Sequence, residues 1–60
     1  MKFELEMNLD DINEKERLMT VIKHLRDVIK RLDNQRKAGG AGEGVLFNDN
    51  QSAIGSFGFI

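Results

Sequence analysis

Apolar and polar side chains alternate strictly over residues 2–9. The apolar side chains fall on one face of the extended chain: Phe3, Leu5, Met7 and Leu9. The positions between them carry polar side chains, and these fall on the opposite face. This period of two is typical of a strand that is buried on one side only. The sequence therefore predicts a half-buried β-strand over residues 2–9.

The apolar positions then change to a helical period. Residues 14–37 contain no glycine or proline, and their apolar positions form one broad stripe: Leu18, Val21, Ile22, Leu25, Val28, Ile29 and Leu32. Two overlapping capping boxes precede the stripe, Asp11 to Glu14 and Asn13 to Glu16, and the sequence does not choose between them. We expect a helix over residues 13–37, which ends because the glycines of a flexible loop at 38–44 cannot sustain it.

Two short apolar runs near the end of the chain flank the segment Asn48-Asp49-Asn50-Gln51. Asn and Asp tolerate the left-handed backbone conformations of tight turns, so the pattern predicts a β-hairpin over residues 45–60. Phe57 and Phe59 share one face of this hairpin, whereas strict alternation puts Ile54 on the other. A bulge near Gly55 would bring Ile54 to the same side, and the register stays open at this point.

These elements predict one α+β domain over residues 1–60, a two-layer βαββ fold. Neither a hairpin nor a helix can hide its own apolar surface, so one long helix is expected to pack on a three-stranded antiparallel sheet. The helix returns the chain so that the first two strands run the same way. The third strand is therefore expected to lie between them, antiparallel to both.

The apolar stripe also fits about two heptads of a coiled-coil seam, although packing beneath the sheet is the preferred interpretation. The stripe is wide for so short a sheet, and we expect some apolar surface to stay exposed. A homo-oligomer, in the simplest case a dimer, would cover it. The candidate interface residues are Phe47, Ile54 and Ile60.

Composition narrows the classes of function. The chain has 60 residues, a formal net charge of −1 and no cysteine, so no disulfide or thiolate zinc site supplements the core. No apolar run approaches the ~20 residues of a membrane span. We therefore expect a soluble cytoplasmic protein that does not bind membranes.

The charge is unevenly distributed, since acids dominate before residue 17 and basic residues dominate from 17 to 37. Five basic residues of the helix are candidates for binding phosphates: Lys23, Arg26, Lys30, Arg31 and Lys37. Solvated helix faces normally carry such residues, no aromatic residue is interleaved with them, and the total charge is slightly negative. Nucleic-acid or nucleotide binding is therefore an alternative that we do not favour.

No set of residues has the spacing of a catalytic or metal site. The single histidine, His24, has Thr20 and Val28 one turn away, which gives it no partner for metal binding or proton transfer, and we interpret it as a surface residue. Helix capping explains the acidic pairs, and the glycine-rich loop follows a helix rather than opening one as a phosphate-binding loop does. We predict no catalytic residue, no metal, no cofactor and no enzyme activity.

The chain opens with Met1-Lys2-Phe3-Glu4-Leu5 and closes with Gly44-Val45-Leu46 and Ile54-Gly55-Ser56-Phe57. At these two ends, and by pattern only in the helix between them, it resembles a family of short uncharacterised proteins encoded mainly by bacteriophages and prophages. It departs from that family where Asn48 replaces an aspartate, Gln51 a glycine and Phe57 a tryptophan. The resemblance implies a phage origin and a βαββ fold, and it brings no assigned activity.

Together these patterns lead us to expect a small phage-encoded accessory protein that acts by binding. Its expected partner is a host protein, such as a defence or metabolic enzyme, which it would inhibit or modulate in the host cell cytoplasm. The two alternatives are nucleic-acid or nucleotide binding through the basic helix and a structural homo-oligomer in a phage assembly.

Overall fold

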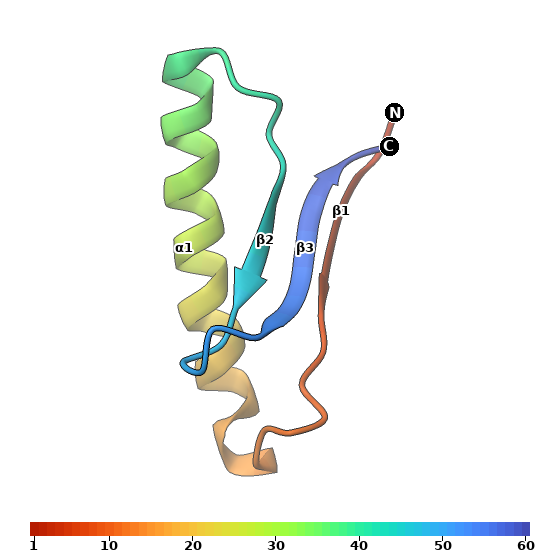
Figure 1. Ribbon diagram of the computed structural model, residues 1–60, viewed down its shortest axis with the longest axis vertical. Coiled ribbons are helices and arrows are strands. Elements are labelled where there is room, and N and C mark those ends of the chain that lie inside the picture. The colour runs from red at the N-terminus through yellow and green to blue at the C-terminus, as the bar shows by residue number, and fades with distance from the viewer.

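The computed structural model describes residues 1–60. The elements are β1 (Phe3–Met7), the 3-10 turn η1 (Glu14–Glu16), α1 (Arg17–Ala38), β2 (Gly44–Phe47) and β3 (Ala53–Phe59). The sheet has the order β1-β3-β2, and both neighbouring pairs are antiparallel. This confirms the predicted α+β arrangement and the central place of the last strand. Helix α1 stands beside β2, β1 forms the far edge, and the two ends of the chain meet beside it (Figure 1).

Asn13 caps the start of the helical segment. Its side-chain oxygen accepts a hydrogen bond from the Lys15 amide at 3.2 Å, and its carbonyl accepts one from the Glu16 amide at 2.8 Å. Asn13 rather than Asp11 is therefore the capping residue, although no bond from the Glu16 side chain back to Asn13 completes a capping box. At the other end Gly39 adopts the left-handed conformation with φ 76°, which closes the helix one residue beyond the predicted end.

The side chain of Gln35 fastens the loop that follows α1. Its Oε1 accepts hydrogen bonds from the amides of Gly42 at 2.7 Å and Glu43 at 3.3 Å, and its Nε2 donates to the Glu43 carbonyl at 3.0 Å. Gly42 has φ 75°, and a Cβ there would lie 2.8 Å from a ring carbon of Phe59. The loop at 38–44 is thus hydrogen-bonded to the helix through Gln35 and lies against Phe59 of the sheet.

A β-bulge sets the register of the hairpin. Leu46 pairs with Gly55 and Phe47 pairs with Ala53, which leaves Ile54 as an extra residue in β3. The predicted bulge near Gly55 is confirmed, and it turns Ile54 toward the core, against which it packs. The turn before it is closed by Asn48, whose side-chain oxygen accepts hydrogen bonds from the amides of Asn50 and Ser52, both at 2.9 Å.

The buried apolar core is small and does not use the whole helical stripe. It consists of Val28, Leu46 and Phe57, with partly buried residues packed around it: Leu5, Met7, Leu32 and Ile54. Four members of the stripe are exposed instead: Leu18, Ile22, Leu25 and Ile29. The sheet therefore covers only part of the stripe, in agreement with the expectation that so wide a stripe would leave apolar surface exposed.

Polar contacts explain which side of α1 turns toward the sheet. The Arg31 Nη1 atom donates a hydrogen bond to the Val45 carbonyl at 2.7 Å, and its guanidinium lies 6.0 Å from the centre of the Phe57 ring. Arg31 and Gln35 share a helix face with Val28, so their bonds to β2 and the loop draw that face onto the sheet. His24 lies on the same face and is buried, which corrects its interpretation as a surface residue.

Candidate functional site

The sheet has one face that the helix does not cover, which we call the outer sheet face. It is defined by the polar side of β1 and by the matching positions of the other two strands: Glu4, Glu6, Val45, Phe47, Ser56 and Gly58. Ser56 in the central strand lies between its register partners Glu6 and Val45. Gly58 lies opposite Glu4. Small residues on the central strand between larger ones on its neighbours leave a trough along β3.

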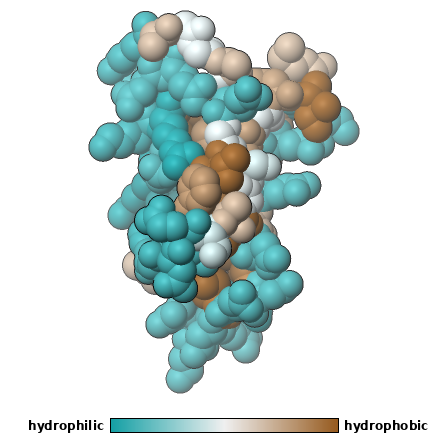
Figure 2. Space-filling view, in the orientation of Figure 1, coloured by the Kyte–Doolittle hydropathy of each residue, from teal (hydrophilic) through white to brown (hydrophobic).

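Two hollows lie along this trough and share Ser56 and Phe57 in their linings. The first, of about 240 Å³, is bounded by Glu4 and Glu6 of β1. The second, of about 500 Å³, is bounded by Glu43 and Val45. Hydrophobic residues also form a short band over β2 on this side of the molecule (Figure 2). The trough therefore has an acidic flank at β1 and a flank at β2 that combines apolar residues with one carboxylate.

The carboxylates of the trough are free to bind a cationic group. The four ion pairs of the structure join Lys23 to Asp49, Arg31 to Asp27, and both Arg36 and Lys37 to Asp33. None of them includes Glu4, Glu6 or Glu43, and all three residues are exposed. An incoming basic side chain would meet these carboxylates without displacing an existing partner.

The three candidate interface residues are not brought together. Phe47 is exposed on the outer sheet face, and Ile60 is exposed beyond the end of β3. Ile54 is half-buried against the core because of the bulge, so it does not contribute to an exposed surface. Only Phe47 belongs to the candidate site.

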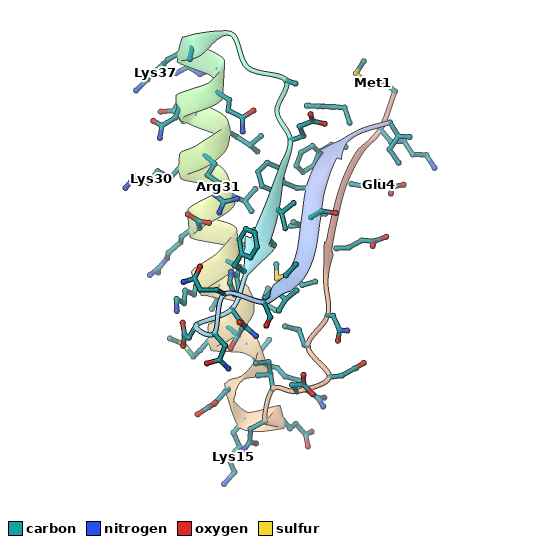
Figure 3. All side chains as sticks on the ribbon, viewed as in Figure 1. Met1, Glu4, Lys15, Lys30, Arg31 and Lys37 are labelled. Carbon is teal, nitrogen blue, oxygen red and sulfur yellow. The ribbon has the colours of Figure 1, made fainter.

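The five basic residues of the helix also separate. Lys30 and Lys37 point away from the sheet, whereas Arg31 points toward β2 and is held there (Figure 3). Lys23 is paired with Asp49 at 3.3 Å, and Lys37 is paired with Asp33 at 3.2 Å. Only Arg26 and Lys30 of the five have no ion-pair partner. The structure therefore offers a sparse basic helix face rather than a concentrated phosphate site.

Asp33 takes part in both ion pairs at the end of α1, with Arg36 and with Lys37, and its titration tests them. The hydrogen bonds from Arg36, at 2.7 and 3.2 Å, and from Lys37 hold the pKa of Asp33 below its ordinary value. A lowered folded-state pKa adds stability above the unfolded pKa of about 3.9, and this stability is lost as the pH falls through the folded value. We expect Asp33→Asn to lower the melting temperature at neutral pH. The difference from the wild type should shrink as the pH falls through the folded-state pKa of Asp33, and a difference that stays constant down to acid unfolding would contradict the assignment.

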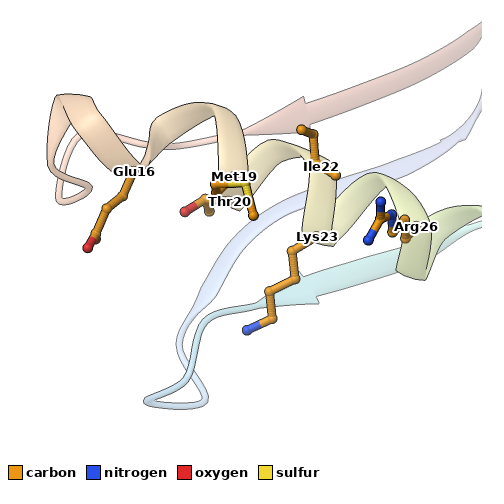
Figure 4. Close-up of a pocket in the computed structure, with 6 residues that line it drawn as sticks. All are labelled: Glu16, Met19, Thr20, Ile22, Lys23 and Arg26. Carbon is orange, nitrogen blue, oxygen red and sulfur yellow. The ribbon is translucent and has the colours of Figure 1, made fainter.

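A further hollow, of about 720 Å³, lies on the exposed side of the helix (Figure 4). Its lining comes from η1 and α1 alone: Glu16, Met19, Thr20, Ile22, Lys23 and Arg26.

The structure contains no group of three side chains arranged to hold a metal ion, and every buried side-chain nitrogen or oxygen has a hydrogen-bond partner. Its helix lacks the length of apolar sequence needed to cross a bilayer.

The trough is shallow and open, with unpaired carboxylates on one flank and apolar side chains on the other. These properties suit it to contact an extended segment with basic and apolar side chains. Sequence reasoning assigned Glu4 and Glu6 to solvent and did not connect them with Ser56 or Gly58. The sequence feature that could have indicated the trough is the pair of small residues, Ser56 and Gly58, on the polar side of the last strand. Comparisons with models of protein families, with curated proteins and with solved structures give no match for this chain.

Proposed function

We propose that the protein is a phage accessory module that binds a host protein through the outer sheet face and thereby inhibits or modulates it. The observation that carries this proposal is an uncovered sheet face with unpaired carboxylates on one flank and apolar side chains on the other. Basic side chains of the target would meet Glu4 and Glu6, and apolar ones would pack beside Val45. A phage origin is supported by the family resemblance of the two ends of the chain.

A protein target fits this surface better than a nucleic acid does. The carboxylates of Glu4, Glu6 and Glu43 would repel phosphates. Val45 and Phe47 are 43% and 48% exposed and give the target apolar area to cover. The basic face of α1 keeps nucleic-acid binding as the second candidate, although only Arg26 and Lys30 are unpaired there.

Ser56→Arg tests the proposed surface directly. Ser56 is exposed at the middle of the trough, so an arginine there fills the trough and opposes a basic target without disturbing the core. Lys30→Glu on the outward side of α1 serves as the matched charge-changing control. We expect a host protein recovered from bacterial lysate by the wild type and by Lys30→Glu to be lost with Ser56→Arg. Equal recovery by all three proteins, or no specific protein with any of them, would refute the proposal.

The second candidate has its own discriminating measurement. Binding to DNA or RNA through α1 should weaken steeply as salt rises from about 50 to about 200 mM, and Lys30→Glu should weaken it further. Ser56→Arg should leave such binding unchanged or strengthen it, because it adds a positive charge. This opposite response of the two variants separates nucleic-acid binding from protein binding.

A further inference from the structure

Four apolar residues run in one line along the exposed side of α1, and we call them the helix stripe: Leu18, Ile22, Leu25 and Ile29. Leu18 and Ile29 are 78% and 67% exposed, while Ile22 and Leu25 are 40% and 38% exposed, so the same chain covers the middle of the line only in part. Their spacing of four, three and four residues is that of a coiled-coil seam. Leucine occupies each d position and isoleucine each a position, the combination that favours two helices over three or four in parallel coiled coils.

The helix stripe borders a second half-covered apolar surface. On the inner face of β1, Phe3 is exposed and Leu5 and Met7 are only half-buried. Ile22 points to the side of α1 on which β1 lies, whereas Lys23 points to the side of the β2–β3 turn (Figure 4). The helix stripe and the inner face of β1 are therefore two partly exposed apolar surfaces on the same side of the molecule.

The chain exposes more surface than a monomer of its size. A globular monomer of 6.8 kDa is expected to expose roughly 4,000 Å². This chain exposes 4928 Å², and only five of its 60 residues are buried. The excess of roughly 1,000 Å² is close to the area of about 800 Å² that each partner contributes to a standard protein interface.

We propose that a second copy of the chain covers both the helix stripe and the inner face of β1. The two α1 helices pair through their helix stripes about a two-fold axis, and each helix also covers the inner face of the partner's β1. The four residues of the stripe are uncharged, so their own side chains bring no charge into this contact. The outer sheet face lies on the other side of the sheet and stays open, so the dimer is independent of the proposed function.

Pairing through the β1 edges is the other way in which two copies could meet, and charge opposes it. An antiparallel pair of β1 strands centred on Leu5 would place Glu4 of one copy directly beside Glu6 of the other. Like charges at directly opposed positions destabilise a sheet. Exposed acidic residues on an edge strand are a usual means of preventing such pairing.

The first test is the mass of the protein in solution. Light scattering should give twice the chain mass of 6.8 kDa for the wild type at micromolar concentration. The double variant Leu18→Glu/Ile29→Glu should raise the dissociation constant at least about 100-fold, because the dimer would bury four carboxylates. Phe47→Glu, on the outer sheet face, is the matched control and should stay dimeric. A monomeric wild type at about 100 µM, or a Leu18→Glu/Ile29→Glu variant that stays dimeric, would overturn the proposal.

A second test does not depend on the folding of a charged variant. The chain has no cysteine, so a single introduced thiol can form a disulfide only with its own copy. Leu25 lies near the middle of the stripe, and Leu25→Cys should form a covalent dimer under mild oxidation whether the helices run parallel or antiparallel. Lys30→Cys on the outward side should not. Equal cross-linking of both variants, or none with Leu25→Cys, would contradict the pairing of the helices. Ser56→Arg tests the outer sheet face instead, so failure of the proposed function and failure of the dimer can be told apart.

Discussion

Replacing Gly55 with alanine is expected to destabilise the protein severely. A Cβ at this position would overlap the carbonyl oxygen of Glu6 and lie 3.0 Å from the Met7 Cα, and both are backbone atoms of the paired strand. Strand β1 would have to move away from β3, at a cost on the order of 3 kcal/mol. A domain of this size has a total stability of only about 3–9 kcal/mol. Far-ultraviolet circular dichroism with urea denaturation measures the loss.

Gly58→Ala is the matched control in the same strand. A Cβ at Gly58 would lie 3.3 Å from the Glu43 Cβ, which belongs to a loop residue that can move by a few tenths of an ångström. We expect this variant to change the free energy of unfolding by less than about 1 kcal/mol. If Gly55→Ala were as stable as Gly58→Ala, the close approach of β1 to β3 at Met7 and Gly55 would be wrong.

The topology follows from features that are local in the sequence. The alternation from Phe3 to Leu9 sets which face of β1 points inward, because successive side chains of a strand point to opposite faces of the sheet. The long helix forces the strands on either side of it to run the same way, and the hairpin then places β3 between them. The bulge was also predictable, since Gly55 and the mismatch between Ile54 and Phe57 both indicate it. These inferences needed no knowledge of tertiary contacts.

The rotation of α1 could not be predicted in the same way. The period of the apolar residues defines a stripe wider than the sheet can cover, and it does not say which part of the stripe is buried. That choice depends on the hydrogen bonds of Arg31 to Val45 and of Gln35 to the loop, which join distant parts of the chain. Long polar side chains beside an apolar stripe normally indicate the face of a helix that is exposed to solvent. In this chain Arg31 and Gln35 instead mark the face of α1 that meets β2 and the loop.

The candidate site was missed for a related reason. Glu4 and Glu6 look like ordinary solvent-facing residues when β1 is considered alone. Their significance depends on Ser56 and Gly58, which become their neighbours only through the register of β1 with β3. The sequence indicated exposed apolar surface correctly, but it did not show that this surface divides between a helix stripe on one side of the molecule and Val45 and Phe47 on the other.

Leu46→Ala is expected to cost about 2–5 kcal/mol, because Leu46 is the one large side chain that is completely buried. It packs with Val28 and Phe57, and so small a core cannot collapse around the resulting cavity without moving α1 off the sheet. The exposed neighbour Val45→Ala should cost less than about 1 kcal/mol. Urea midpoints must be compared at one protein concentration, because self-association would add to stability. Equal losses for the two variants would contradict the placement of Leu46 at the centre of the core between α1 and the sheet.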